Sequence, residues 1–428
     1  IKIINDGSQD AKIKMSGKNA IGIYAKNNNS TSNVSDHIVE NSGEITVGKS
    51  DGGTAVGIYA DKVTVKPKDG NINIGKGAVG IFATPKTVVG TSGDALGKIT
   101  YAGNNGVAIY LEGNSTDDSK LEGTKLTLSD DPSILTPTTG KIGIFSNLEN
   151  TSTFKQEIDA STAKNVIAYY SAKKDMNVEA NITLSEGSTG VTGAIGKKLA
   201  YGNDITPYIL KVGKKSTGIV GDNNIIIGSK TNIKLSGNEG SIGAYATGAS
   251  GRIVAKGKLT FENEKSTGLF ARNGATIEET GANYDLDFTA SNAKKNTGIY
   301  LAGAKWIGRN SAITFNSNHE KGNIYLFAQG SKEGTTTFGN TITLNNVFNV
   351  NPGGTASVTN KAIGMYLDTN VKGTTDKFVE NTLDLTNSNA KINVTSKGIG
   401  VYAKNSSNTV NNTIKLTKIS SDGNETVG

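Results

Sequence analysis

The feature that most constrains the fold of this chain is a five-residue motif that returns throughout it: aliphatic, glycine, aliphatic, aromatic, small. The clearest copies occupy residues 21–25, 56–60 and 79–83. With degraded copies included, the motif occurs about fourteen times between residues 24 and 402, at a mean spacing of roughly 29 residues. A repeat of this length cannot bury its apolar face alone, so successive copies must stack on one another.

Short apolar alternations accompany the motif. One stands upstream of most copies, as at residues 45–47 and 72–74, and a less regular one follows, as at residues 63–65. Alternation with period two over so few residues is typical of a strand with one buried face. The sequence therefore predicts an all-β protein, a right-handed parallel β-helix with about three strands per coil and about fourteen coils.

The repeat extends over nearly the whole sequence. We expect a single β-helical segment over residues 1–428 that continues beyond both ends, because the sequence begins and stops within the repeat. Polar stretches of variable length are expected to be loop insertions between coils. They lie near residues 26–36, 111–123, 129–140, 345–361 and 368–377.

The motif also predicts which side chains face inward. The aliphatic residue after the glycine, such as Ile58, is never polar and should form an inward column. Strict alternation then places the aromatic residues in an outward column beside the glycines, whose backbone they would shield. The alternative is that each aromatic residue begins a corner and turns inward. The candidate binding residues on the outer aromatic face are Tyr24, Tyr59, Phe82, Tyr110, Tyr300, Tyr366 and Tyr402.

Composition limits the classes of partner that the chain is expected to bind. The net charge is +7, but the basic residues are almost all lysine, and arginine occurs only at Arg252, Arg272 and Arg309. We interpret this as the translation bias of an AT-rich genome, because base readout and phosphate recognition favour arginine. No nucleic acid partner is predicted. No apolar run is long enough to span a bilayer, so the segment is not expected to be membrane-embedded.

Motifs that would indicate catalysis or metal binding are weak. Residues 43–50 match the phosphate-binding loop pattern, but their centre reads as a strand and no helix follows, so we interpret the match as chance. His37 and His319 are the only histidines and should lie many coils apart, which argues against a triad or a histidine metal site. The sequence contains no cysteine. We predict neither a cofactor nor a metal.

Paired carboxylates offer one route to an enzyme. Asp285 and Asp287 flank Leu286 on an expected strand, and Glu262 and Glu264 have the same spacing. Side chains at i and i+2 share a face, roughly 6–7 Å apart, which suits acid–base chemistry on a polysaccharide. Outward polar residues at this spacing are, however, ordinary in such strands, so the chain is predicted not to be an enzyme.

The single tryptophan is the last candidate. Trp306 lies near Arg309, in a segment that we take for a loop, and both are candidate binding residues there. The alternative is that the tryptophan packs at a corner of the coil.

The repeated phrasing, as at residues 20–25 and 55–60, resembles the repeats of very large type V autotransporter adhesins of fusobacteria. Arginine-inhibitable and galactose-sensitive, lectin-like adhesins belong to this group. The resemblance runs from Lys12 to Lys415 and is specific for the architecture rather than for one member. It implies a β-helical passenger on the surface of a Gram-negative bacterium, anchored by an outer-membrane β-barrel outside this sequence.

The same resemblance implies adhesion, as in coaggregation or virulence. The expected partners are host cell-surface glycoproteins, glycans or immune receptors, or other bacteria, and the segment is expected to be a monomer. The family has no binding motif that can be placed here, so no binding residue is carried over. Two alternatives stay open: a polysaccharide-degrading β-helix enzyme, and a purely mechanical stalk for a binding domain outside this fragment.

Overall fold

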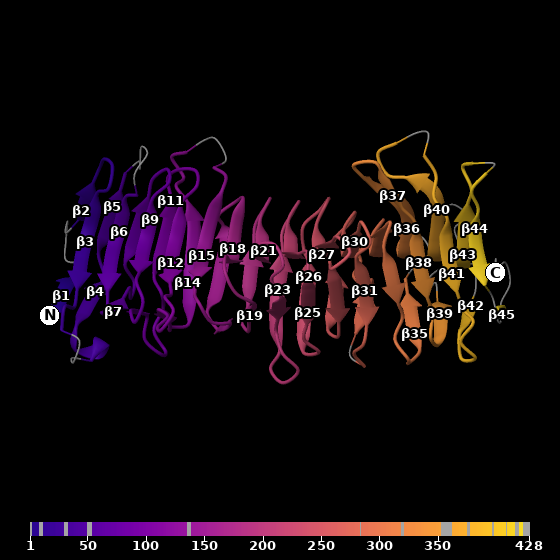
Figure 1. The fold of residues 1–428 in the computed structure, drawn as a ribbon, viewed down its shortest axis with the longest axis horizontal. Coiled ribbons are helices and arrows are strands. Elements are labelled where there is room, and N and C mark those ends of the chain that lie inside the picture. Colours follow the sequence, from indigo (N-terminus) through magenta and orange to yellow (C-terminus); the bar gives the residue numbers. More distant parts are fainter. Residues whose placement is uncertain are drawn as a thin grey trace. The chain divides into compact units, whose positions relative to one another are not determined.

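The computed structural model describes most of the chain in two compact units, residues 1–199 and 200–428. The described residues are 2–7, 12–29, 33–48, 54–134, 138–282, 284–317, 321–351, 362–374, 377–395, 398–407, 409–415 and 419–422. Within each unit the chain forms short strands that pair in parallel with their counterparts in the next coil (Figure 1). Each unit is therefore a parallel β-helix, as the repeat predicts.

Unit 1 winds into three faces. Its motif sheet, which contains every copy of the five-residue motif in this unit, consists of β3 (Ile21–Lys26), β6 (Val56–Asp61), β9 (Val79–Ala83), β12 (Val107–Glu112), β15 (Lys141–Asn147), β18 (Val166–Ser171) and β21 (Thr189–Gly193). The second sheet consists of β2 (Lys12–Met15), β5 (Glu44–Val47), β8 (Asn71–Ile74), β11 (Lys98–Tyr101), β14 (Lys125–Asp130), β17 (Glu157–Thr162) and β20 (Ile182–Leu184).

The third face of unit 1 is divided. One part consists of β1 (Lys2–Asn5), β4 (Ile38–Asn41), β7 (Thr64–Lys66), β10 (Val88–Val89) and β13 (Lys120–Leu121), and the other of β16 (Ser152–Phe154) and β19 (Met176–Val178). A 3₁₀ turn, η1, spans Val34–Asp36, and β22 (Leu199–Tyr201) includes the residues on either side of the division between the units.

Unit 2 repeats this plan. Its motif sheet consists of β24 (Thr217–Gly221), β27 (Ile242–Thr247), β30 (Thr267–Arg272), β33 (Thr297–Ala302), β36 (Ile324–Glu333), β40 (Ile363–Val371) and β43 (Ile399–Lys404). The third face consists of β25 (Asn224–Ile227), β28 (Arg252–Ala255), β31 (Thr276–Glu279), β34 (Lys305–Ile307), β38 (Asn340–Thr343), β41 (Asn381–Asp384) and β44 (Asn412–Lys415).

The second face of unit 2 comes in two parts. One consists of β23 (Tyr208–Val212), β26 (Thr231–Leu235), β29 (Lys258–Phe261) and β32 (Asp285–Asp287). The other consists of β35 (Ile313–Asn316), β39 (Val347–Asn351), β42 (Lys391–Thr395) and β45 (Ile419–Asp422).

The predicted inward column is confirmed in both units. Ile58 pairs with Ile23 and Ile81, and in unit 2 Ile299 pairs with Leu269. All five side chains are buried, and four of them have no exposed surface. Because each of these coils supplies one such side chain, their burial contributes to holding neighbouring coils together.

The predicted position of the glycines is wrong. A Cβ at Gly57 would lie 2.6 Å from the carbonyl oxygen of Gly80 and 2.8 Å from Cγ2 of the buried Ile72, so this position faces the interior. The strand does not alternate strictly here, since the pairing runs from Val56 to Ile58 and skips the glycine. The rings therefore do not shield a glycine column, and the glycine is needed because the next coil approaches so closely.

Several expected insertions contain strands. β13 lies within residues 111–123, and β39 lies within residues 345–361, where it pairs with β35 and β42. Residues 352–361 fall outside the described part of the chain. One extension was not predicted: β36 continues beyond the motif and pairs with β37 (Thr336–Phe338) in an antiparallel hairpin (Figure 1).

The phosphate-loop match lies in a strand. β5 pairs in register with β2 and β8, as the interpretation of the match as chance requires. Lys49 and Ser50 of the pattern are outside the described residues.

Candidate functional site

The aromatic residues of the motif form one continuous ladder in unit 1. Its members are Tyr24, Tyr59, Phe82, Tyr110, Phe145 and Tyr170, each paired in register with the next. Ring centroids are 4.7–5.3 Å apart, and the first five rings are parallel to within 5–9°. The rings lie on the outer side of the strands, so the outward orientation is correct and the inward alternative is wrong.

Unit 2 carries a second ladder of the same kind. Its members are Tyr245, Phe270, Tyr300, Phe327, Tyr366 and Tyr402. The centroids are 4.7–5.3 Å apart, but the Tyr245–Phe270 pair is tilted by 36° and the Tyr300–Phe327 pair by 50°. All seven residues predicted for the outer aromatic face therefore lie in these two ladders.

Stacking limits what the ladders offer a partner. Each inner ring covers the faces of its neighbours, so ring edges and tyrosine hydroxyl groups are what point outward. Tyr24 is 55 % exposed and Tyr402 is 43 % exposed, whereas the other ladder residues are half-buried. A partner would meet a row of edges rather than a series of flat platforms for stacking.

Charged side chains flank the ladder of unit 1. Lys26 pairs with Asp61 at 3.7 Å, and Lys173 pairs with Glu149 at 2.7 Å. Partial burial, with Asp61 adding to it, raises the pKa of the Tyr59 hydroxyl above its usual value. The Tyr59 phenol thus stays protonated near neutral pH and can donate as well as accept hydrogen bonds.

In unit 2 an extension of the chain lies against the ladder. The ammonium group of Lys372 lies 5.2 Å from the ring centroid of Phe270 and 5.0 Å from that of Tyr300. Gln329 donates to the Tyr300 hydroxyl. Burial raises the pKa of Tyr300 to about 12, despite the opposing effects of Gln329 and Arg272. This ladder is therefore partly covered.

Trp306 is not a surface residue. It lies on β34, pairs with Ile277 and Ile342 in the inward column of the third face, and has no exposed surface. The prediction of a loop contact is wrong because alternation along this strand turns the tryptophan inward, while Lys305 and Ile307 on either side are more exposed. The alternative, that Trp306 packs at a corner of the coil, is also wrong, because Trp306 is the central residue of β34.

Trp306 belongs to a buried polar cluster around one acidic residue, Glu279. The indole Nε1 donates to Oε1 of Glu279 at 3.0 Å, and the Tyr325 hydroxyl donates to the same oxygen at 2.9 Å. Glu279 is only 2 % exposed, and its Oε2 has no hydrogen-bond partner among the described residues. The hydroxyl of Tyr284, also buried, has none among them either. We call Glu279, Tyr284, Trp306 and Tyr325 the Glu279 cluster.

Glu279 and Tyr325 were missed at the sequence level, although both carried a signal. Glu279 stands two residues after the inward Ile277, so period two places a carboxylate in the core. Tyr325 occupies the glycine position of its motif copy, as the register of Ile299 with Leu326 shows. A charged inward residue and a lost glycine in neighbouring coils mark this region as different from the repeat.

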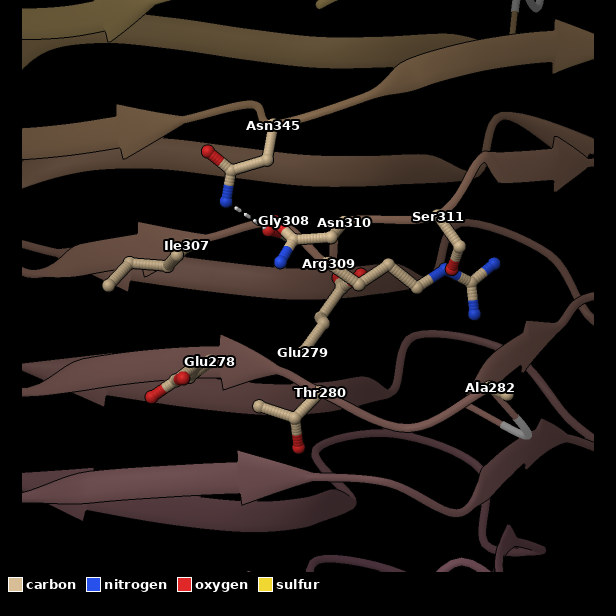
Figure 2. A pocket seen from close by; sticks show the side chains of 10 residues that line it. All are labelled: Glu278, Glu279, Thr280, Ala282, Ile307, Gly308, Arg309, Asn310, Ser311 and Asn345. Carbon is tan, nitrogen blue, oxygen red and sulfur yellow. Dashed lines mark hydrogen bonds between the residues drawn. The ribbon is translucent and has the colours of Figure 1, made fainter. Parts of the chain in front are cut away.

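A pocket of about 400 Å³ adjoins the cluster (Figure 2). Glu279 and Arg309 both line it, with the polar residues Asn310 and Asn345. Asn345 Nδ2 donates to the Gly308 carbonyl oxygen at 2.7 Å, which joins two successive coils at its wall. The wall combines acceptors with amide and hydroxyl donors, as in sites for small polar ligands.

Arg309 is more confined than a loop contact would be. Its Nη1 donates to the Tyr284 carbonyl oxygen at 2.6 Å, and its Nη2 donates to the Ala312 carbonyl oxygen, also at 2.6 Å. Most of its donors therefore form hydrogen bonds to backbone carbonyl groups near the pocket. The guanidinium remains a source of positive field for Glu279.

The first predicted carboxylate pair lies on β32 and is joined to a lysine. Asp287 forms an ion pair with Lys258, whose Nζ lies 2.8 Å from Oδ2, and it accepts hydrogen bonds from Thr289. Burial alone would raise its pKa, but Lys258 and Thr289 together hold it below the usual value. Burial raises the pKa of Asp285, with Lys258 opposing it. The pKa values of the two aspartates are thus shifted in opposite directions, and Asp287 is engaged by Lys258 and Thr289 at the strand surface.

The second predicted pair, Glu262 and Glu264, follows β29 rather than lying on a strand. Glu262 pairs with Lys234 at 3.5 Å, and Glu264 pairs with Lys265 at 3.9 Å. The two carboxylates contact different lysines, which is an ordinary arrangement for a solvated turn.

The described residues show few features of other kinds of site. His37 follows η1, and His319 lies outside the described part. Within that part, no three histidine, cysteine or acidic residues are grouped as metal ligands. None of its helices has the length and apolar character needed to cross a membrane.

Comparison with known proteins does not identify a relative: no family model, curated protein or solved structure matches this chain.

Proposed function

We propose that this chain is a rigid segment of an adhesin displayed on the surface of a Gram-negative bacterium. The partners would be host cell-surface glycans, glycoproteins or receptors, or other bacteria. The observation that carries the proposal is the ladder in each unit, which presents the same outward edge at coil after coil. Repetition of a shallow contact converts weak single contacts into firm attachment.

The ladder of unit 1 is the favoured contact surface. Its rings are held in place by their neighbours, so a partner that binds their edges would not have to order them. The hydroxyls of Tyr24, Tyr59 and Tyr110 supply polar contacts, and the ion pairs beside them, such as Lys26 with Asp61, supply charge. Such a surface suits a hydroxyl-rich or amide-rich partner better than a flat apolar one.

Substitution of tyrosine by phenylalanine tests this role with little effect on folding. The ladder already contains Phe82 and Phe145, so Tyr24→Phe, Tyr59→Phe and Tyr110→Phe together keep every stacked pair. The full chain and this triple variant would be coupled to beads and applied to bacterial cells, host cells and a glycan array. The proposal expects binding by the full chain and at least about tenfold weaker binding by the variant.

Two results would contradict the proposal in different ways. Undiminished binding by the triple variant would move the contact away from the hydroxyl edge of unit 1. Absence of binding to any cell or glycan would leave this segment as a mechanical stalk. Phe82→Tyr is the matched control, because it adds a hydroxyl to the same row.

A further inference from the structure

Three successive coils of unit 2 depart from the repeat at one place. Glu279 stands where the preceding coil has Ala255, and Trp306 stands where the preceding coil has Ile277. Tyr325, in the next coil, replaces the glycine of the motif. The three side chains meet, because Trp306 and Tyr325 donate to one oxygen of Glu279 at 3.0 and 2.9 Å. The carboxyl group thus joins three coils.

We propose that Glu279 is a proton-binding site in the core of unit 2, and that its protonation couples the packing of these three coils to the ambient pH. Both donors use Oε1, so Oε2 is the oxygen that takes up the proton. With the proton bound, the carboxyl group is neutral and suits its apolar surroundings. Without it, a negative charge lies in a site only 2 % exposed, which is costly.

The charged groups around the site do not neutralise an ionised Glu279. Arg309 is the cation whose field reaches it, but that guanidinium donates to the carbonyl oxygens of Tyr284 and Ala312. On the same strand, Glu278 is joined to Arg252 instead.

Of the remaining neighbours, two tyrosines are neutral and one lysine is paired with an aspartate. Burial raises the pKa of Tyr284 and of Tyr325 well above the usual value, so both phenols stay neutral. In the preceding coil, Lys256 lies beside Gly281, and its ammonium group pairs with Asp204 at 3.3 Å. The site therefore responds to protons, with Arg309 as the main opposing charge.

Burial raises the pKa of Glu279 to about 7, while Trp306, Tyr325 and Arg309 act in the opposite direction. The pKa of a glutamate in the unfolded chain is about 4.3. A carboxyl group with a raised folded-state pKa stabilises the fold fully below the unfolded value, and this contribution is lost as pH rises through about 7. The coils joined by Glu279 are therefore tightest in mild acid.

The pocket gives the ionised state a source of water. Glu279 lines the pocket of about 400 Å³, although its Oε2 is itself buried (Figure 2). A water molecule that enters from the pocket would solvate Oε2 when the proton leaves, since an ionised carboxylate needs further donors. Loss of the proton thus hydrates the cluster and makes the surroundings of Trp306 more polar.

The chain contains a single tryptophan, so its fluorescence reports this site alone. Trp306 emission of the full chain would be recorded between about pH 5 and pH 9. The expected result is one transition with a midpoint near 7, towards longer wavelength at high pH. Glu279→Gln should abolish the transition, whereas Glu278→Gln, one residue away and facing outward, should leave the midpoint unchanged.

A second variant tests the assignment even if Glu279→Gln does not fold. Tyr325→Phe removes a donor that favours the ionised carboxylate, so the midpoint should move to higher pH. Thermal unfolding of the unaltered chain should show a melting temperature that falls as pH rises through 7. The proposal is overturned by a flat wild-type titration, by an unchanged transition in Glu279→Gln, or by an unmoved midpoint in Tyr325→Phe.

Discussion

The two aromatic ladders are built from the same motif but pack differently. In unit 1 five consecutive rings are parallel to within 5–9°, whereas in unit 2 the Tyr300–Phe327 pair is tilted by 50°. Phe327 lies on β36, the strand that continues into the hairpin with β37, and Lys372 contacts the neighbouring rings. The largest tilt thus falls on the strand that extends into the hairpin, whereas the Phe270–Tyr300 pair that Lys372 contacts is parallel to within 7°.

The inner columns of the two units do not share this difference. Ile58 in unit 1 and Ile299 in unit 2 have no exposed surface and occupy the same place in the motif. The repeat thus fixes the interior more strictly than the outer face. Predictions that compare matched positions in the two units therefore distinguish the contribution of the interior to stability from that of the outer face.

The largest effect is expected for charges in the inner column. Ile58→Asp and Ile299→Asp should each destabilise the protein by at least about 4 kcal/mol, because each buries an unpaired carboxylate. Circular dichroism melting should show similar losses for both, with Asn28→Asp at an exposed position as a silent control. A mild loss at only one of the two positions would show that the interiors of the units differ.

Removal of a ring should lower the stability of the protein by different amounts in the two units. Tyr59→Ala deletes two stacked pairs and should cost about 2 kcal/mol, whereas Tyr300→Ala also deletes the Lys372 contact and should cost about 3 kcal/mol. Chemical denaturation of the two variants measures the difference. Equal costs would mean that the covering of the unit 2 ladder adds no stability.

The repeat was sufficient to predict the coils, the inward column and the register of the rings. The orientation of two residues was predicted wrongly from the sequence. Gly57 faces inward because the strand departs from alternation there, and Trp306 is buried because residues 305–307 form a strand, not a loop, whose alternation turns the tryptophan inward. The inward position of Glu279 could have been predicted from the alternation along its strand. Its two hydrogen-bond donors come from other coils, so they could be identified only from the structure.

Loss of a single hydroxyl should have a smaller effect that again differs between the ladders. Tyr300→Phe removes the hydrogen bond with Gln329 and should cost about 1 kcal/mol, measured by denaturation. Tyr59→Phe removes a hydroxyl at the open ladder and should be nearly neutral. The reverse order would indicate that the Gln329 contact does not persist in solution.

The smallest effect on stability is expected at the covering residue itself. Lys372→Ala removes the cation from Phe270 and Tyr300 and should cost only about 0.5 kcal/mol. Its effect on recognition should be larger, because it uncovers ring edges that unit 1 already presents. If the ladders are the adhesive surface, this variant should bind cells or glycans more strongly than the unaltered chain, with Lys377→Ala as the control. Weaker binding by Lys372→Ala would instead assign the contact to the extension that carries Lys372.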